Sequence, residues 1–230
     1  MASYFIFNGK SSKEFPIIVN KLPPIQSPKR KVEVFESEGI DGNLVVDYET
    51  YEPFVYSIEF TFMSSDMKAM RMVNSWLSCE GKLTLSDELD KYYYARVCNS
   101  ISYEKIKTFG IRRAIVQFEC QPFAYEYHVT SIEIVQDAIV YNSTNANSLP
   151  EITVYGTGEC RLSINNNEVI LKDVEEHITL DCELEEAHKN GEGKNNKMVG
   201  EVTKLLPGEN EITLSNNIEK LVLQPRWRWR

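Results

Sequence analysis

Residues 54–62 read FVYSIEFTF, and along them apolar and polar side chains alternate. The even positions, from Phe54 to Phe62, carry aromatic or branched aliphatic groups, whereas the odd positions are mostly polar. Successive side chains of a strand point to opposite faces of a sheet, so this period of two predicts a β-strand with one buried face. The same alternation recurs at Val32/Val34, Leu44/Val46/Tyr48, Tyr92/Tyr94 and Ala114/Val116/Phe118/Cys120. The sequence therefore predicts a mainly β fold.

One segment departs from this period. Residues 66–78 read DMKAMRMVNSWLS, and their apolar side chains recur at intervals of three and four, which is typical of one face of an α-helix. Ser65 is the expected N-cap. We predict one helix lying on a sheet, with an apolar face made of Met67, Met70, Val73, Trp76 and Leu77.

Residues 20–31 read NKLPPIQSPKRK and carry three prolines and four cations. Proline has no N–H to donate to a neighbouring strand, so this segment is expected to be an extended arm or loop rather than a central strand. Two interpretations stay open. The arm either reaches a partner, through Lys29, Arg30 and Lys31 above all, or forms a local surface loop.

The segment 141–149, YNSTNANSL, is small and polar and precedes Pro150, so a domain boundary is predicted here. The chain then divides into residues 1–140 and residues 141–230. The second part again shows short alternating strands, with asparagine-rich turns at 165–167 and 215–217 and a long flexible loop expected over 186–200. Evenly spaced short strands favour a small β-sandwich or jelly roll.

Composition restricts the function. The chain has 25 Lys and Arg against 34 Asp and Glu, a net charge of −9, which argues against a general nucleic-acid or anionic-membrane binder. No apolar run approaches the roughly 18 residues of a membrane span. The five cysteines form no CxxC pair, and they are expected to be reduced and mostly in the core. They are Cys79, Cys98, Cys120, Cys160 and Cys182.

No catalytic motif is present: the common phosphate-loop, nucleophile-elbow and zinc-protease patterns are absent. His177, Cys182 and His188 form one possible metal set with Cys160, but the spacing is not that of a zinc finger or ribbon. Acidic clusters near 87–90 and 175–186 are more simply explained as exposed strand ends than as a catalytic pair. We predict no catalytic residue, metal ligand or cofactor.

The chain ends in Arg226-Trp227-Arg228-Trp229-Arg230. Trp227 and Trp229 either contact a partner or a sugar, with cation–π support from the arginines, or they bury one face of a last strand.

The order of local patterns resembles the distal tail proteins (Dit) of siphophages that infect Gram-positive bacteria. The resemblance covers essentially the whole chain, with isoleucine at position 40 where arginine is frequent in the family. The similar stretches are Tyr4–Gly9, Gly39–Leu44, Ser75–Leu77, Gly81–Leu83, Asp90–Ala95, Phe118–Tyr125, Pro150–Ile152, Tyr155–Gly158 and Leu206–Ile212.

The resemblance implies an N-terminal tail-tube-like β-sandwich with one α-helix and an extended arm, followed by a galectin-like or jelly-roll β-sandwich. It further implies a non-enzymatic hub at the virion tail tip, made in the cytoplasm of the bacterial host. Copies of the chain would form a hexameric ring that DNA crosses without specific binding. The ring would join the tail tube protein to the tail-associated lysin or fibre protein, and carry receptor-binding or baseplate proteins.

Contacts within such a ring are expected from the arm cations and from the helix side chains Met67, Met70 and Trp76. The main alternative is a carbohydrate-binding sandwich in which Trp227 and Trp229 stack on a host cell-wall saccharide. A hydrolase that uses the acidic clusters, and a tail-tube or baseplate protein of a contractile particle, are weaker alternatives.

Overall fold

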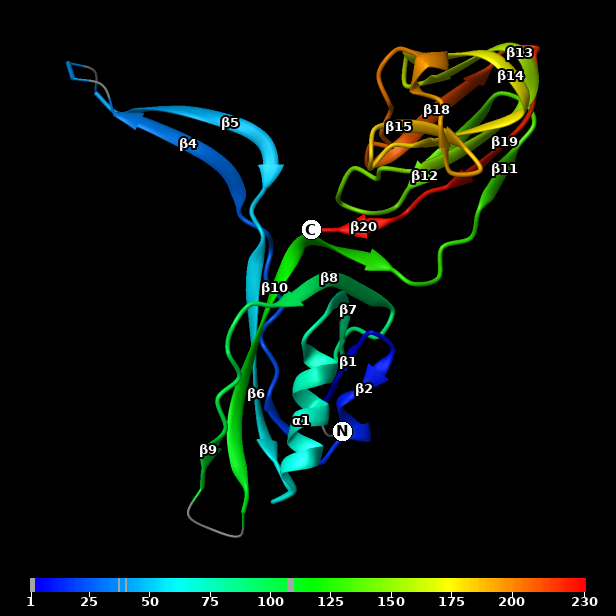
Figure 1. Cartoon of the computed structure of the whole chain (residues 1–230). Coiled ribbons are helices and arrows are strands. Elements are labelled where there is room, and N and C mark those ends of the chain that lie inside the picture. The colour runs from blue at the N-terminus through cyan, green and yellow to red at the C-terminus, as the bar shows by residue number, and fades with distance from the viewer. Residues whose placement is uncertain (1–2, 37, 40, 107–109) are drawn as a thin grey trace. The chain divides into compact units, whose positions relative to one another are not determined.

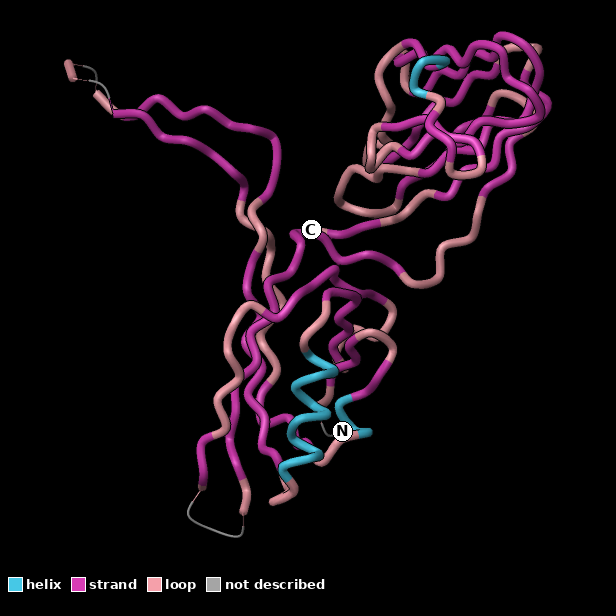
Figure 2. Tube along the Cα trace, viewed as in Figure 1, coloured by secondary structure: helices cyan, strands magenta, loops and turns pink. Residues whose placement is uncertain are grey.

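The computed structural model describes residues 3–36, 38–39, 41–106 and 110–230. The chain folds as two compact units, one made of Met1–Ala124 with Arg230 and the other of Tyr125–Trp229. Both are built from strands, and the described residues contain a single α-helix (Figures 1 and 2). The predicted fold class, mainly β with one α-helix, is confirmed.

The first unit is built on one antiparallel sheet with the strand order β2-β1-β7-β8-β10-β6-β3, and β9 pairs with β10. These elements are β1 (Phe5–Phe7), β2 (Lys10–Ser11), β3 (Ile17–Lys21), β6 (Phe54–Phe62), β7 (Glu80–Leu85), β8 (Lys91–Val97), β9 (Glu104–Lys105) and β10 (Arg112–Glu126). A short 3-10 turn, η1 (Ser12–Glu14), follows β2.

Strand β6 carries the alternation that predicts the fold. Its inward side chains, from Tyr56 to Phe62 at every second position, are completely buried. β6 pairs with β10 from Arg112 opposite Phe62 to Cys120 opposite Phe54. The predicted strand with one buried face is confirmed.

The helix α1 (Met67–Leu77) lies within the predicted segment. Its N-cap is Asp66 rather than Ser65: the Asp66 side chain accepts a hydrogen bond from the Lys68 N–H at 2.8 Å. Aspartate and serine cap equally well, so sequence alone does not choose between them. The buried face of α1 consists of Met70, Val73, Trp76 and Leu77.

Strands β4 (Arg30–Glu36) and β5 (Asn43–Tyr51) form a two-stranded sheet of their own. The strands predicted around Val34 and Val46 are therefore present, but the buried face predicted for them is wrong, because their side chains are exposed. The proline-rich residues 22–29 form no strand and lead into this hairpin. Ile40, where the resemblance departs from its family, lies outside the described residues.

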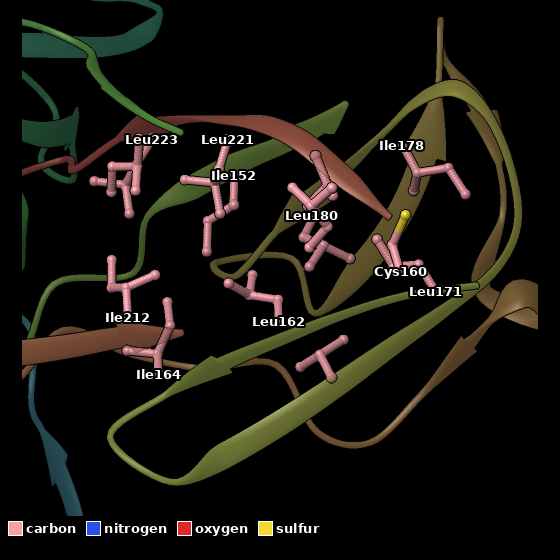
Figure 3. Close-up of a cluster of buried hydrophobic side chains, with 14 of the residues drawn as sticks. Ile152, Cys160, Leu162, Ile164, Leu171, Ile178, Leu180, Ile212, Leu221 and Leu223 are labelled. Carbon is pink, nitrogen blue, oxygen red and sulfur yellow. The ribbon is translucent and has the colours of Figure 1, made fainter. Parts of the chain in front are cut away.

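The second unit is one curled sheet with the strand order β11-β19-β13-β14-β15-β16; β17 pairs with β14, and β18 pairs with both β12 and β13. Apolar side chains from its strands form a common core (Figure 3). The strands of this sheet are β11 (Ile132–Ile134), β12 (Ala138–Asn142), β13 (Glu151–Ile164), β14 (Asn167–Asp181), β15 (Glu186–Lys189), β16 (Glu192–Gly193), β17 (Met198–Val199), β18 (Gly208–Leu214) and β19 (Ile218–Gln224), with a 3-10 turn η2 (Asn195–Lys197). The short strand β20 (Arg228–Trp229) is not part of this sheet.

The boundary between the units lies between Ala124 and Tyr125, not after residue 140 as predicted. β11 and β12 both precede residue 143, yet they pair with β19 and β18 of the second unit. The polar segment 141–149 is not a linker. Asn142 is buried and its side chain donates to the carbonyls of Ala146 and Leu205, at 3.0 and 3.2 Å.

Two further predictions differ from the structure. The loop expected over 186–200 contains the β15–β16 hairpin, and β15 pairs with β14. The turn at 215–217 exists, but β18 and β19 do not pair with each other: they pair with different parts of β13. The hairpin turn predicted at Asn165–Asn166 is confirmed, and both residues have positive φ.

Candidate functional site

The β4–β5 hairpin is the main candidate for a functional surface in the first unit. Its register places Val34 opposite Val45 and Phe35 opposite Leu44. Residues that lie opposite each other share a face of the ladder, so the two valines occupy one face while Phe35 and Leu44 occupy the other. All four are exposed, by 50% for Val34, 55% for Val45, 45% for Phe35 and 66% for Leu44.

Both faces of this hairpin are thus apolar and open to solvent. Val32 adds to the face of the two valines, and Val46 adds to the opposite face. A two-stranded hairpin is marginally stable alone in water, and contiguous exposed apolar surface marks an interaction site. The hairpin has the chemistry of a segment that is covered on both faces by other protein.

The cations predicted to contact a partner lie at the base of the hairpin and bind within it. Arg30 Nε is 2.6 Å from the Asp47 carboxylate, and the Lys29 ammonium is 3.2 Å from Glu52. The Arg30 hydrogen bond lowers the pKa of Asp47 below its ordinary value. Lys31 lies over the Tyr48 ring at 5.6 Å from its centroid. These exposed pairs orient the base of the hairpin, and a partner contact by Lys29, Arg30 and Lys31 stays a prediction.

The helix side chains predicted at the ring interface divide into two groups. Met67 is exposed at the start of α1, whereas Met70 and Trp76 are buried. The Trp76 indole N–H donates to the Phe7 carbonyl at 2.9 Å, and its ring stacks on Phe15 at 4.5 Å between centroids. The core of their own unit encloses Met70 and Trp76, so they have no surface to offer a neighbour. Helical spacing identifies this face and does not distinguish a core from an interface.

The two C-terminal tryptophans are partly buried in the second unit. Trp227 packs against the apolar core, and the Trp229 indole N–H donates to Glu126 at 2.7 Å. Their partial burial matches the interpretation in which they bury one side of a last strand, and a contact of either ring with a sugar or partner stays a prediction.

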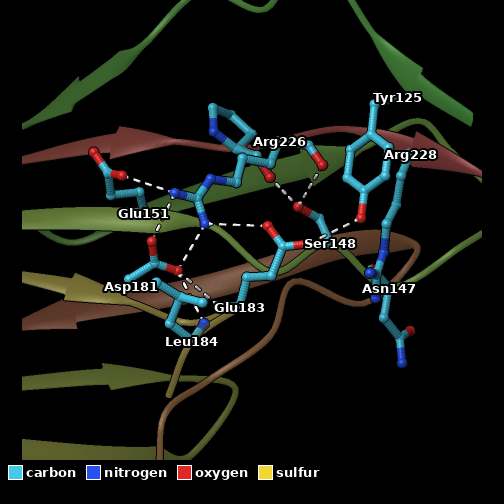
Figure 4. A network of polar contacts seen from close by, with 10 residues as sticks. Tyr125, Asn147, Ser148, Glu151, Asp181, Glu183, Leu184, Arg226 and Arg228 are labelled. Carbon is cyan, nitrogen blue, oxygen red and sulfur yellow. Dashed lines mark hydrogen bonds and ion pairs between the residues drawn. The ribbon is translucent and has the colours of Figure 1, made fainter. Parts of the chain in front are cut away.

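Arg226 is the centre of a polar network that sequence reasoning did not find (Figure 4). Its guanidinium donates hydrogen bonds to both carboxylate oxygens of Asp181, at 2.7 and 2.8 Å, and to the Glu151 carboxylate at 2.7 Å. The Arg226 hydrogen bonds lower the pKa of Asp181, whereas burial raises the pKa of neighbouring Tyr125 to about 12. A bidentate Arg–carboxylate pair fixes geometry well, so this network attaches the C-terminal segment to β13 and β14.

The acidic and thiol groups of the described residues gather into no cluster that could bind a metal. No three His, Cys, Asp or Glu side chains among them lie close enough to hold a metal ion. Cys120, Cys160 and Cys182 are buried, and burial raises the pKa of each thiol. The described part of the chain also contains no helix with the length and hydropathy of a membrane span.

Comparison with known proteins identifies the family. Residues 7–120 match the model of the phage tail protein RIFT-related domain. No curated protein matches the sequence. Among solved structures, the Dit protein of phage SPP1 matches with a TM-score of 0.77 and 12% identity, over 97% of this chain and 98% of that chain. Its description calls it a paradigm of the hub adsorption apparatus in phages that infect Gram-positive bacteria.

A second match is the baseplate of phage p2 in its activated conformation with Sr, with a TM-score of 0.48 and 9% identity, over 97% of this chain and 98% of that chain. Through residues 7–120 the chain belongs to the phage tail protein family with the RIFT-related domain, and over nearly its whole length it has the fold of a siphophage distal tail protein.

Proposed function

We propose that this protein is a non-enzymatic structural hub of the phage tail tip, and that its copies close into a hexameric ring. The first unit, the ring-forming domain, joins the tail tube to the tail-associated lysin or fibre protein. The second unit, a galectin-like sandwich, carries receptor-binding or peripheral baseplate proteins. DNA crosses the ring without specific binding, in keeping with a net charge of −9. The protein is made in the host cytoplasm and incorporated into the virion.

The observation that carries this proposal is the β4–β5 hairpin with its two exposed apolar faces. A closed ring is a heterologous assembly, in which each subunit offers one surface and receives another. The hairpin supplies the first surface. Burying the remaining area of a half-exposed Val, Phe or Leu contributes about 1 kcal/mol, so several such side chains give a contact that persists when repeated around a ring.

The outer face of the first unit's sheet offers the second surface. Ile18 of β3, Val55 of β6 and Ile115 of β10 are exposed on the side of the sheet that faces away from its core. Ion pairs lie among them, with Arg113 at 3.1 Å from Glu59 and Arg96 at 2.6 Å from Glu119. An apolar patch whose charges are already paired with each other fits an apolar hairpin better than it fits a charged partner.

The proposal is tested by the native mass of the purified full-length protein and by negative-stain images. An annulus of six subunits supports it, and a strictly monomeric protein at micromolar concentration overturns it. Replacing Lys29, Arg30 and Lys31 by serine then tests the arm: a hexamer that is unchanged at every salt concentration removes these cations from the interface.

A further inference from the structure

Strand β12 lies at an open edge of the second unit. It pairs with β18 from Ala138 opposite Ile212 to Asn142 opposite Gly208, and no described strand pairs with its other side. Natural edge strands are usually protected by lysine, proline, a bulge or a covering segment. The five residues of β12 read AIVYN and contain neither lysine nor proline.

The backbone of Glu211 shows which groups face the open side of β12. Glu211 lies opposite Ile139, but its N–H donates to Asn165 Oδ1 at 3.1 Å and its carbonyl accepts from the Asn165 N–H at 3.0 Å. The backbone N–H and C=O of Glu211 therefore point away from β12. In an antiparallel ladder this makes Glu211 and Ile139 a non-hydrogen-bonded pair, so the N–H and C=O of Ile139 also point outward.

Because the pattern repeats every two residues, the N–H and C=O of Tyr141 point outward as well. The structure gives the backbone groups of Ile139 and Tyr141 no partner within the described part of the chain. Two donors and two acceptors are thus aligned along the edge in the arrangement that an incoming strand requires.

The side chains around these backbone groups indicate the partner's chemistry. Ile139 is 65% exposed and Tyr141 is 66% exposed. Glu211 and Glu209 lie opposite them on β18, and both carboxylates are exposed without an ion pair to any described residue. We refer to Ile139, Tyr141, Glu209 and Glu211 together as the β12 edge.

We propose that the β12 edge accepts an extended segment of another protein as an additional strand, and that this segment alternates apolar residues with lysine or arginine. Side chains alternate between the two faces of a strand, so the lysines or arginines of the segment would lie on the face of Ile139 and Tyr141, with their aliphatic stems packed beside these side chains and their charges toward Glu209 and Glu211. Its apolar residues would lie on the opposite face, which carries the buried Val140. An added strand would lie about 10 Å from β18, two strand spacings away, which is slightly more than the Debye length of about 8 Å at physiological salt. Long cationic side chains would shorten that distance by crossing the Tyr141 ring toward Glu209.

A second copy of this chain fits the β12 edge poorly. Pairing β12 with β12 would bring four like carboxylates to one small surface, and the chain as a whole carries a charge of −9. The inference rests on the proposed function only in that the second unit is there proposed to carry other proteins of the tail. It concerns a surface distinct from the hairpin, so the two proposals can fail separately.

The test uses the full-length protein and a fluorescent eight-residue peptide of alternating lysine and valine, with binding followed by fluorescence anisotropy. We expect saturable binding that weakens with salt. The same peptide with alternate amides N-methylated loses the donors along one edge, and its affinity should fall at least about tenfold. Equal binding of both peptides, or no saturable binding, overturns the proposal.

Two variants locate the site. Ile139→Pro removes an outward N–H from an edge position where strands tolerate proline, and Tyr141→Lys places a cation in the apolar strip. Each should weaken peptide binding at least about tenfold. Leu184→Lys is the matched control for Tyr141→Lys, because the Leu184 side chain has the same exposed fraction, 66%. This control variant should bind the peptide as the unchanged protein does.

If Ile139→Pro does not fold, Tyr141→Lys alone decides, and unchanged affinity in that variant overturns the proposal. Self-association that is lost with Tyr141→Lys would also overturn it, because the occupant would then be a second copy. A protein with Phe35→Ser and Leu44→Ser in the hairpin should bind the peptide normally, which separates this inference from the ring.

Discussion

Phe35 lies directly opposite Leu44 in the β4–β5 hairpin, and both side chains are open to solvent on the same face. Val34 and Val45 form the corresponding pair on the opposite face. Burying only one face of the hairpin would leave the other apolar face in water. We therefore expect both faces to be buried when the protein assembles.

We expect the double change Phe35→Ser and Leu44→Ser to lower the native mass of the assembled protein. Losing about 1 kcal/mol per side chain weakens each contact by roughly thirtyfold. The fold of the first unit should be retained, because β4 and β5 pair with each other and not with the main sheet. Native mass spectrometry measures the first effect and circular dichroism the second.

The matched control is the double change Ile139→Ser and Tyr141→Ser, which removes comparable exposed apolar groups from the second unit. It should leave the mass unchanged. A companion variant, Val34→Ser with Val45→Ser, tests the other face of the hairpin. If the valine variant assembles normally while the Phe35→Ser, Leu44→Ser variant does not, only one face of the hairpin is buried in the assembly, and the prediction that both faces are buried is wrong.

Trp76 provides a test of a core role against an interface role. Trp76→Phe keeps an aromatic ring but leaves the Phe7 carbonyl without the indole donor, which should lower the free energy of unfolding by about 1–3 kcal/mol. Because Trp76 is buried, the native mass at temperatures where the variant is folded should not change. Chemical denaturation and native mass measure the two effects, and a change in mass without a change in stability would place Trp76 at an interface after all.

The period of two predicts strands reliably here, but it does not say what covers their apolar side. In β6 the covering layer belongs to the same unit, whereas in β4 and β5 the same pattern faces solvent. Alternation indicates that one face of a strand has to be buried, and the layer that buries it can belong to another molecule. No local signal in residues 30–51 distinguishes these two cases.

Polar composition is ambiguous in a similar way. The segment 141–149 has the residues of a linker, yet Asn142, Thr144 and Ser148 are buried and hydrogen-bonded. Their partners include Leu205, which is remote in sequence and cannot be anticipated from the segment itself. The Arg226 network escapes sequence reasoning for the same reason, since Glu151 and Asp181 come from different strands.

Arg226→Met should destabilise the second unit, because it leaves the nearly buried Asp181 carboxylate without its main partner. We expect a loss of about 2–4 kcal/mol in the free energy of unfolding, and a smaller loss for Arg226→Lys, which keeps the charge but not the bidentate grip. Urea denaturation of the three proteins measures these differences. Equal stability of all three would show that the network does not hold the C-terminal segment.

The effect of Arg226→Met should also depend on pH. Hydrogen bonds from Arg226 lower the pKa of Asp181 in the folded protein below its ordinary value. The stabilisation is therefore fully present above about pH 4 and is lost as the pH falls through the lowered pKa of the folded state. The difference in the free energy of unfolding between the unchanged protein and Arg226→Met should shrink in acid. A difference that grows in acid would show that Arg226 does not lower the pKa of Asp181.

The five thiols should separate into reactive and protected groups. Cys79 and Cys98 are exposed, whereas burial raises the pKa of Cys120 and of Cys182 to about 12 and also raises the pKa of Cys160. The thiolate is the reactive form, so iodoacetamide at pH 8 should modify the first two and spare the other three in the folded protein. Intact-mass measurement should show two adducts in the folded protein and five after denaturation. Rapid modification of Cys120 or Cys182 in the folded protein would mean that the core of its unit opens far more readily than this packing allows.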